Sequence, residues 1–166
     1  GQTMQAAIGQ SDSLFTPLQL AEYCATVANN GERHSASILK SVRSFSYGDN
    51  VYEREDEILS KVESPQYNWD AVKEGMRLVG KSTLTGYTMT SVAAKTGTAQ
   101  KGKSVANDAI FICYAPFDDP EIAMAIVVQK GSAGSNCSVI ASEILKAYFS
   151  MKSATDITDV EGELLQ

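Results

Sequence analysis

The chain has 166 residues, 43% of them hydrophobic, which is enough to bury one sizeable core as a single domain. Its 20 acidic and 14 basic residues give a net charge of −6, which argues against nucleic acid or an anionic membrane surface as a partner. No run approaches the roughly 20 apolar residues of a membrane span. Cys24, Cys113 and Cys137 lack metal-ligand spacing and His34 is the single histidine. We therefore expect buried free thiols, a surface histidine, and neither a metal site nor a cofactor.

The first predicted helix covers residues 17 to 29. Thr16 is a good N-cap, Pro17 suits the first helical position, and Gln19 completes a capping box with Thr16. Gly31 is the expected end of this element.

Residues 47 to 64 are polar and charged. Gly48-Asp49-Asn50 has turn composition, and Glu53 to Glu57 form a charge run. The pattern predicts a solvated hairpin or loop.

A second helix is predicted after this segment, with Asn68 or Ser64 as its cap and Gly80 as its end. Its apolar residues recur at spacings of three and four, which is typical of an amphipathic helix: Trp69, Val72, Met76 and Val79. Trp69 could serve as a substrate platform, but burial statistics for such stripes favour a core anchor.

Residues 88 to 94 are rich in β-branched and small side chains, which predicts an extended segment. It leads into Lys95-Thr96-Gly97-Thr98, which combines a cation, two hydroxyls and a flexible backbone. Such a set suits an edge strand that lines an anion-binding cleft, since Gly97 lets a ligand approach the backbone closely. The alternative is a surface lysine that protects a strand edge, with threonines of ordinary strand propensity and a glycine bulge.

Two apolar runs follow, at 109 to 115 and 122 to 128, with Asp108 as a turn residue before the first and a Pro116 to Pro120 turn between them. They predict a hairpin whose strands are apolar on both faces. Strands covered on both sides require helices on both sides. We therefore expect an α/β fold, an α/β/α sandwich with a central antiparallel sheet.

A final helix is predicted from Ser135 or Asn136. Its expected buried stripe is Val139, Ile140, Ile144 and Ala147. Beyond Ser153 the chain is acidic with few large apolar groups, so we divide it into a folded body, 1–152, and a disordered tail, 153–166.

The Lys-Thr-Gly triplet occurs in penicillin-binding proteins and serine β-lactamases. Ala7–Gln10, Thr16–Ala21 and Ala28–Gly31 resemble the stretch before this motif in high-molecular-weight, class B type penicillin-binding transpeptidases. Ala94–Gln100 resembles their version of the triplet more than a β-lactamase's. The resemblance covers about residues 4 to 150 in order.

In that family the nucleophilic serine and a Ser-x-Asn motif precede the region matched here. The resemblance therefore implies the C-terminal half of a transpeptidase domain, incomplete at its N-terminal side. Ser37 and Lys40 fit the pattern Ser-x-x-Lys, but they follow Gly31 in a segment of extended character, where their side chains would point to opposite faces. We interpret this match as coincidental.

The resemblance also implies the roles of the site residues. Lys95 would set the electrostatics of the cleft, and the Thr98 backbone N–H would stabilise the oxyanion. Thr96, Gly97 and Thr98 would bind the substrate, with the two threonine hydroxyls binding its carboxylate. The expected activity is peptidoglycan D,D-transpeptidation by serine acyl transfer. Gln100 and Lys101 lie at the rim of the expected site.

The implied partners are the N-terminal half with the nucleophile, the peptidoglycan stem peptide and β-lactams. We expect the parent protein to work at the extracytoplasmic face of the bacterial membrane, held by a single N-terminal anchor. An isolated half should expose an apolar edge or face, and a second polypeptide cleaved upstream of Gly1 would cover it. Alternatives are a non-catalytic peptide- or protein-binding module of the same fold and, among enzymes, a D,D-carboxypeptidase or β-lactamase.

Overall fold

The computed structural model describes most of the chain. The described residues are 4, 14–45, 48–101 and 105–163, with side chains as far as residue 153. Residues 7–10, which carry part of the family resemblance, and 102–104, in the loop after the Lys-Thr-Gly strand, lie outside them. Among the helices of the described part, none is both long and apolar enough to cross a bilayer.

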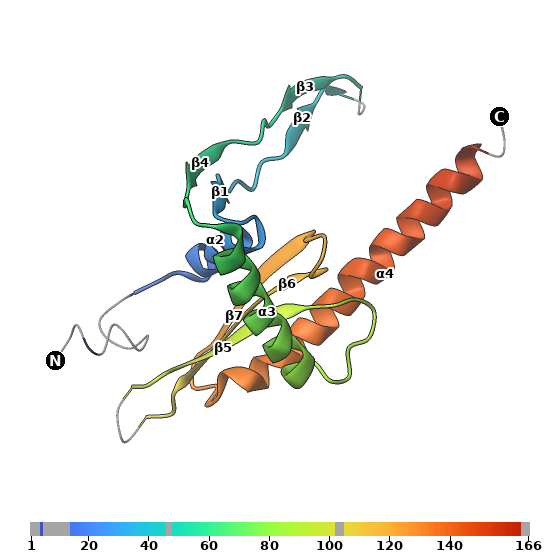
Figure 1. The fold of residues 1–166 in the computed structure, drawn as a ribbon. Coiled ribbons are helices and arrows are strands. Elements are labelled where there is room, and N and C mark those ends of the chain that lie inside the picture. Colours follow the sequence, from blue (N-terminus) through green and yellow to red (C-terminus); the bar gives the residue numbers. More distant parts are fainter. Residues whose placement is uncertain (1–3, 5–13, 46–47, 102–104, 164–166) are drawn as a thin grey trace.

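The middle layer is an antiparallel sheet in the order β5-β6-β7 (Figure 1). Its strands are β5 (Ala93–Ala99), β6 (Asp108–Ala115) and β7 (Ile122–Val128). The predicted hairpin of β6 and β7 is confirmed. Its strands can be apolar on both faces because both faces of the sheet are covered.

Helices cover both faces of the sheet, which confirms the predicted α/β/α sandwich. α2 (Pro17–Ala28) and α3 (Gln66–Thr83) lie on one face, and α4 (Ser138–Glu163) crosses the other (Figure 1). Two buried clusters result. The α2/α3 side contains Cys24, Val27, Ala28, Met76, Ala93, Ile112 and Tyr114, and the α4 side contains Leu84, Tyr87, Val92, Ala94, Ala109, Phe111, Cys113, Ala115, Cys137, Ala141 and Leu145.

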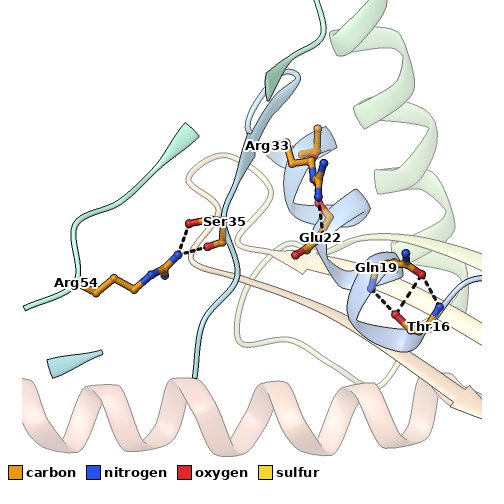
Figure 2. Close-up of polar contacts among 7 residues, drawn as sticks. Thr16, Gln19, Glu22, Arg33, Ser35 and Arg54 are labelled. Carbon is orange, nitrogen blue, oxygen red and sulfur yellow. Dashed lines mark hydrogen bonds and ion pairs between the residues drawn. The ribbon is translucent and has the colours of Figure 1, made fainter. Parts of the chain in front are cut away.

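The helix α2 begins with the predicted capping box. Gln19 N donates to Thr16 Oγ1 over 3.2 Å, and Thr16 N donates to Gln19 Oε1 over 2.9 Å (Figure 2). Two backbone donors at the helix start are thereby satisfied.

The predicted ends of α3 are wrong. Pro65 is its N-cap residue and makes no side-chain capping bond, while Asn68 Nδ2 donates to Ser64 Oγ over 3.1 Å instead. Gly80 does not end the helix, because α3 continues to Thr83. A Cβ at Gly80 would collide with the Val92 carbonyl, so this glycine serves close packing against the segment before β5.

The predicted stripe of α3 is only partly buried. Met76 is 7% exposed and Val79 packs against the core, whereas Val72 is 49% exposed. Trp69 is half-buried and lies over Gly31. It anchors the start of the helix to the turn after α2.

The expected lead-in strand is also wrong. Residues 88–92 are irregular, and β5 begins at Ala93, so that the Lys-Thr-Gly triplet occupies the centre of the strand.

The predicted buried stripe of α4 is wrong. Val139, Ile140 and Ile144 are 68%, 44% and 43% exposed. A 3-10 turn, η2 (Gly134–Cys137), precedes α4 and directs a second apolar series to the sheet instead: Cys137, Ala141 and Leu145.

The helix α4 continues to Glu163 (Figure 1). Residues 153–163, which the sequence indicated as a disordered tail, therefore have helical backbone.

The described residues between 32 and 61 form a two-stranded arm that extends from the body beside α2 (Figure 1). β1 (Glu32–His34) pairs with β4 (Ile58–Lys61), and β2 (Ser41–Arg43) pairs with β3 (Asn50–Glu53). The polar segment 47–64 is thus half of a longer hairpin rather than a hairpin by itself. β3 and β4 are exposed along their whole length.

Polar contacts hold the base of the arm. The Arg54 guanidinium donates to the carbonyl and the hydroxyl of Ser35, and Arg33 lies 3.6 Å from Glu22 of α2 (Figure 2). His34 Nδ1 lies 2.7 Å from Asp56 Oδ2, with 30% of the histidine side chain exposed. His34 is therefore a partly exposed hydrogen-bond partner of Asp56.

Candidate functional site on strand β5

The candidate site lies on a strand at the edge of the sheet. In the described part of the chain, β5 pairs with β6 alone, with Lys95 opposite Ile112, Thr96 opposite Phe111 and Thr98 opposite Ala109. No strand of the described chain pairs with the opposite edge of β5. A strand edge of this kind can bind an extended ligand.

The pleat of β5 separates the site side chains. Ile112, the partner of Lys95, belongs to the core on the α2/α3 side, whereas Phe111 belongs to the core on the α4 side. Directly opposed residues share a face of the sheet. Lys95 therefore points to the α2/α3 side, and Thr96 and Thr98 point to the α4 side. The three polar groups can meet a common ligand only at the open edge of the strand.

Lys95 is exposed, and its Nζ donates to the Thr96 carbonyl over 2.6 Å. The side chain thus folds back along its own strand. An exposed ammonium held beside an open strand edge provides positive charge where an anion can approach.

Gly97 is not required by crowding from the neighbouring strand. A Cβ at this position would lie 3.4 Å from Ile110 Cβ, which is ordinary contact, and its φ is not in the left-handed region. The close contact in this region is at Gly134 of η2, where an added Cβ would collide with the backbone of Gly97.

Just beyond the site strand, an ion pair joins β5 to β6. Lys101 Nζ lies 2.6 Å from Asp108 Oδ2, and Asp108 Oδ1 accepts the N–H of Lys130 over 2.8 Å. The hydrogen bond from Lys101, helped by that of Lys130, lowers the pKa of Asp108. Asp108 is the first residue of β6 rather than a turn residue. Opposite charges on either side of a short loop were the only sequence signal for this contact.

Other candidate chemistry is absent from the described residues. Ser37 and Lys40 lie in an irregular segment, where Ser37 Oγ accepts the Leu39 N–H, so the helical Ser-x-x-Lys geometry is not formed. Cys24, Cys113 and Cys137 are buried and form no disulfide. Within the described ranges, no three His, Cys, Asp or Glu side chains are grouped to hold a metal ion.

Two pockets in the described structure lie away from residues 95–98. A groove of 490 Å³ lies beside α2 and is lined by residues that include Phe15, Tyr23 and Arg33. A pocket of 200 Å³ lies between the end of α3 and residues 90–92. Neither of these two pockets is lined by residues of β5.

A central antiparallel sheet between helices, with Lys-Thr-Gly on its edge strand, is the arrangement found in penicillin-binding proteins and serine β-lactamases. Comparison with known proteins separates these classes. The family described as "Penicillin binding protein transpeptidase domain" matches residues 1–150. The chain belongs to this family.

Individual relatives agree with this assignment. Penicillin-binding protein 2A of Bacillus subtilis is 34% identical over 178 residues, which cover 94% of this chain and 25% of the relative. The structure of penicillin-binding protein 2B from Streptococcus pneumoniae superposes with a TM-score of 0.82 at 26% identity, over 90% of this chain and 27% of that one. A penicillin G acyl-enzyme complex of penicillin-binding protein A from Mycobacterium tuberculosis gives 0.76 at 27% identity, over 87% of this chain and 34% of that one. The chain thus spans about a quarter of the length of the first two relatives.

Proposed function

We propose that this chain is the C-terminal part of a peptidoglycan D,D-transpeptidase domain. The observation that carries the proposal is the open edge of β5 with Lys95, Thr96 and Thr98 beside it, in a chain of the penicillin-binding transpeptidase family. The nucleophilic serine would come from the N-terminal half of the same protein, which would form the opposite wall of the cleft.

The reaction is serine acyl transfer. The serine oxygen attacks the carbonyl between the two terminal D-alanines of a stem peptide, the bond to the last D-alanine breaks, and that residue leaves as the free amine. The acyl group then passes to the amine of a second stem peptide, which cross-links the two and regenerates the serine. The chain described here would bind the donor and stabilise charge on its carbonyl oxygen.

The backbone of β5 supports the oxyanion role of Thr98. A Cβ built on Gly134 would lie close to three backbone atoms: Gly97 N, Gly97 O and Ile110 O. Gly97 and Ile110 are partners in the β5–β6 ladder, and the closeness of these atoms fits a hydrogen-bonded pair. Residues alternate in an antiparallel ladder, so Thr98 would direct its N–H to the open edge. A backbone donor at an open edge can stabilise a developing oxyanion.

Lys95, Thr96 and Thr98 would share the recognition of the donor carboxylate. Threonine hydroxyls beside an ammonium make charge-assisted hydrogen bonds to a carboxylate. In the assembled cleft, Lys95 would leave the Thr96 carbonyl and contact the Ser-x-Asn serine. The same groups would hold a β-lactam, and one relative, penicillin-binding protein A of Mycobacterium tuberculosis, forms an acyl-enzyme complex with penicillin G.

Exposed apolar side chains support a covering N-terminal half. Val139, Ile140 and Ile144 of α4 are between 43% and 68% exposed. Large apolar groups exposed on one helix favour association with another segment. We place the parent protein at the extracytoplasmic face of the bacterial membrane, where its substrate is found.

The test is penicillin labelling of the whole polypeptide that contains this sequence, followed by intact-mass analysis and mapping of the adduct. The proposal predicts one adduct, on a serine that precedes residue 1, and loss of labelling in Lys95→Ala. The separate 166-residue chain should acquire no adduct. An adduct on Ser37 would overturn the assignment of the nucleophile. A correctly folded whole polypeptide without any adduct would favour a non-catalytic binding module.

A further inference from the structure

Gly134 lies against the backbone of the site strand from the α4 side. It is the first residue of η2 and is buried. A Cβ there would stand 2.5 Å from Ile110 O and 2.7 Å from Gly97 N, and closer still to Gly97 O. Real Cβ atoms do not approach other atoms so closely. Only glycine, which has no Cβ, allows η2 to lie against the backbones of β5 and β6 at Gly97 and Ile110.

Two other glycines of the described chain show no such crowding. Gly75 in α3 and Gly86 in the turn after it have no atom within 4 Å of a built Cβ. The atoms that Gly134 meets are backbone atoms of paired strands, which cannot rotate away as a side chain can. An added methyl group must therefore displace η2, β5 or both.

Gly134 also contacts a site side chain. Its N–H donates to Thr98 Oγ1 over 3.4 Å, a long bond between residues 36 positions apart. A hydroxyl whose lone pair receives an N–H is favoured to direct its own proton elsewhere. The Gly134 N–H therefore occupies one lone pair of the Thr98 hydroxyl and constrains its orientation.

The loop that carries Gly134 is itself fixed. Asn136 Nδ2 donates to the Gly131 carbonyl over 2.9 Å, and Asn136 N donates to the Ala133 carbonyl over 2.9 Å. Ala133 N in turn donates to the Gly131 carbonyl over 3.0 Å. The support behind β5 is therefore a closed turn rather than a flexible connection.

We propose that Gly134 is a positioning residue of the transpeptidase site. It holds the Gly97 backbone in position from the α4 side of the sheet and orients the Thr98 hydroxyl toward the carboxylate of the donor. This inference rests on the proposed function above. Gly134 touches no substrate, and it acts through β5. The position of an oxyanion donor matters because a misplacement of about 1 Å can slow a reaction by about 100-fold.

The test compares Gly134→Ala with Gly75→Ala in the whole polypeptide. The rate constant for acylation by a fluorescent penicillin is measured well below the thermal unfolding temperature of each variant. We expect Gly134→Ala to acylate about 10- to 100-fold more slowly, and Gly75→Ala to keep the wild-type rate. A folded Gly134→Ala protein with the wild-type rate would refute the positioning role.

A double-mutant cycle separates positioning from general loss of structure. Thr98→Val keeps the shape of the side chain and removes the hydroxyl. If Gly134 acts through Thr98 and its strand, Thr98→Val will cost less in the Gly134→Ala background than in the wild type. If the two substitutions slow acylation by independent factors that simply multiply in the double mutant, the proposal is contradicted.

If Gly134→Ala does not fold, Asn136→Ala provides a second test of the same proposal. It loosens the turn at an exposed position and adds no volume. We expect slower acylation with little change in the unfolding temperature, and an unchanged rate would count against the proposal. A wild-type polypeptide that penicillin does not label at all would instead defeat the proposed function, so the two failures are distinguishable.

Discussion

The carboxylate of Asp108 and the ammonium of Lys101 lie 2.6 Å apart, and they tie the end of the site strand to the start of β6. Because Lys101 lowers the pKa of Asp108 in the folded chain, the ionised carboxylate stabilises the fold at pH values above its ordinary pKa of about 3.9. That contribution is lost as the pH falls through the lower pKa of the folded state.

We therefore expect Asp108→Asn to lower the free energy of unfolding at pH 7 and to have a smaller effect below about pH 4. Urea unfolding at a series of pH values measures the difference. Asp119→Asn, at an exposed turn position, is the control and should not change this pH dependence. An equal effect of Asp108→Asn at both pH values would contradict the ion-pair interpretation.

Leu145 and Ile144 are neighbours in α4 with opposite environments. Leu145 is fully buried against the sheet, whereas Ile144 is 43% exposed. We expect Leu145→Ala to cost about 2–5 kcal/mol of unfolding free energy, and Ile144→Ala to cost clearly less. Chemical denaturation of the 166-residue chain measures both. If Ile144→Ala cost more unfolding free energy than Leu145→Ala, the buried stripe predicted from the sequence would be the correct one.

The turn after α2 depends on a glycine. Gly31 has a φ of +98°, and a Cβ there would lie 2.7 Å from Cζ2 of Trp69. A side chain in this left-handed conformation costs about 1–3 kcal/mol, so Gly31→Ala should destabilise the chain by at least that amount. Gly86→Ala, where a Cβ meets open space, serves as the control in the same denaturation experiment. Equal stability of the two variants would be inconsistent with the observed packing.

The three cysteines should be unreactive in the folded chain. Burial raises the pKa of Cys113 to about 12 and also raises the pKa values of Cys24 and Cys137. The thiolate is the reactive form, so alkylation by iodoacetamide at pH 8 should be slow until the chain is unfolded. Mass spectrometry of native and urea-treated samples checks this. Rapid native labelling of any one cysteine would show local opening around it.

Local sequence signals predicted part of the fold well. The capping box of Thr16 and Gln19 fixed the start of α2, and two apolar runs around a proline-containing turn fixed β6 and β7, because these signals act between neighbours in the chain. Gly80 was misread as a helix end because its role is packing against Val92, a tertiary contact that leaves no local pattern.

The apolar series of α4 shows a second limit. Two stripes are present in the sequence of this helix, one through Ile140 and Ile144 and one through Ala141 and Leu145. The larger side chains favoured the first stripe, but the second stripe is the one buried against the sheet. Periodicity can identify a helix without choosing between competing faces.

The residue types of the site were recognisable, but its geometry was not. The sequence located Lys95 to Thr98 on an edge strand. Alternation along the strand divides them between two faces, and which face each one takes depends on the register with β6, a tertiary relationship without a local sequence signal. Asp108 and Gly134 were missed because each acts on a segment that is distant in the sequence or separated by a loop.

The arm leaves the body after α2 and returns just before α3, and both helices pack on the same side of the sheet. Packing in the body, rather than the covalent path through residues 32–61, therefore keeps the two parts of the chain together. A protease that cuts at the exposed tip of the arm should yield two fragments that remain associated in native buffer and separate in denaturant. The same tip is a suitable insertion point for a tag or reporter.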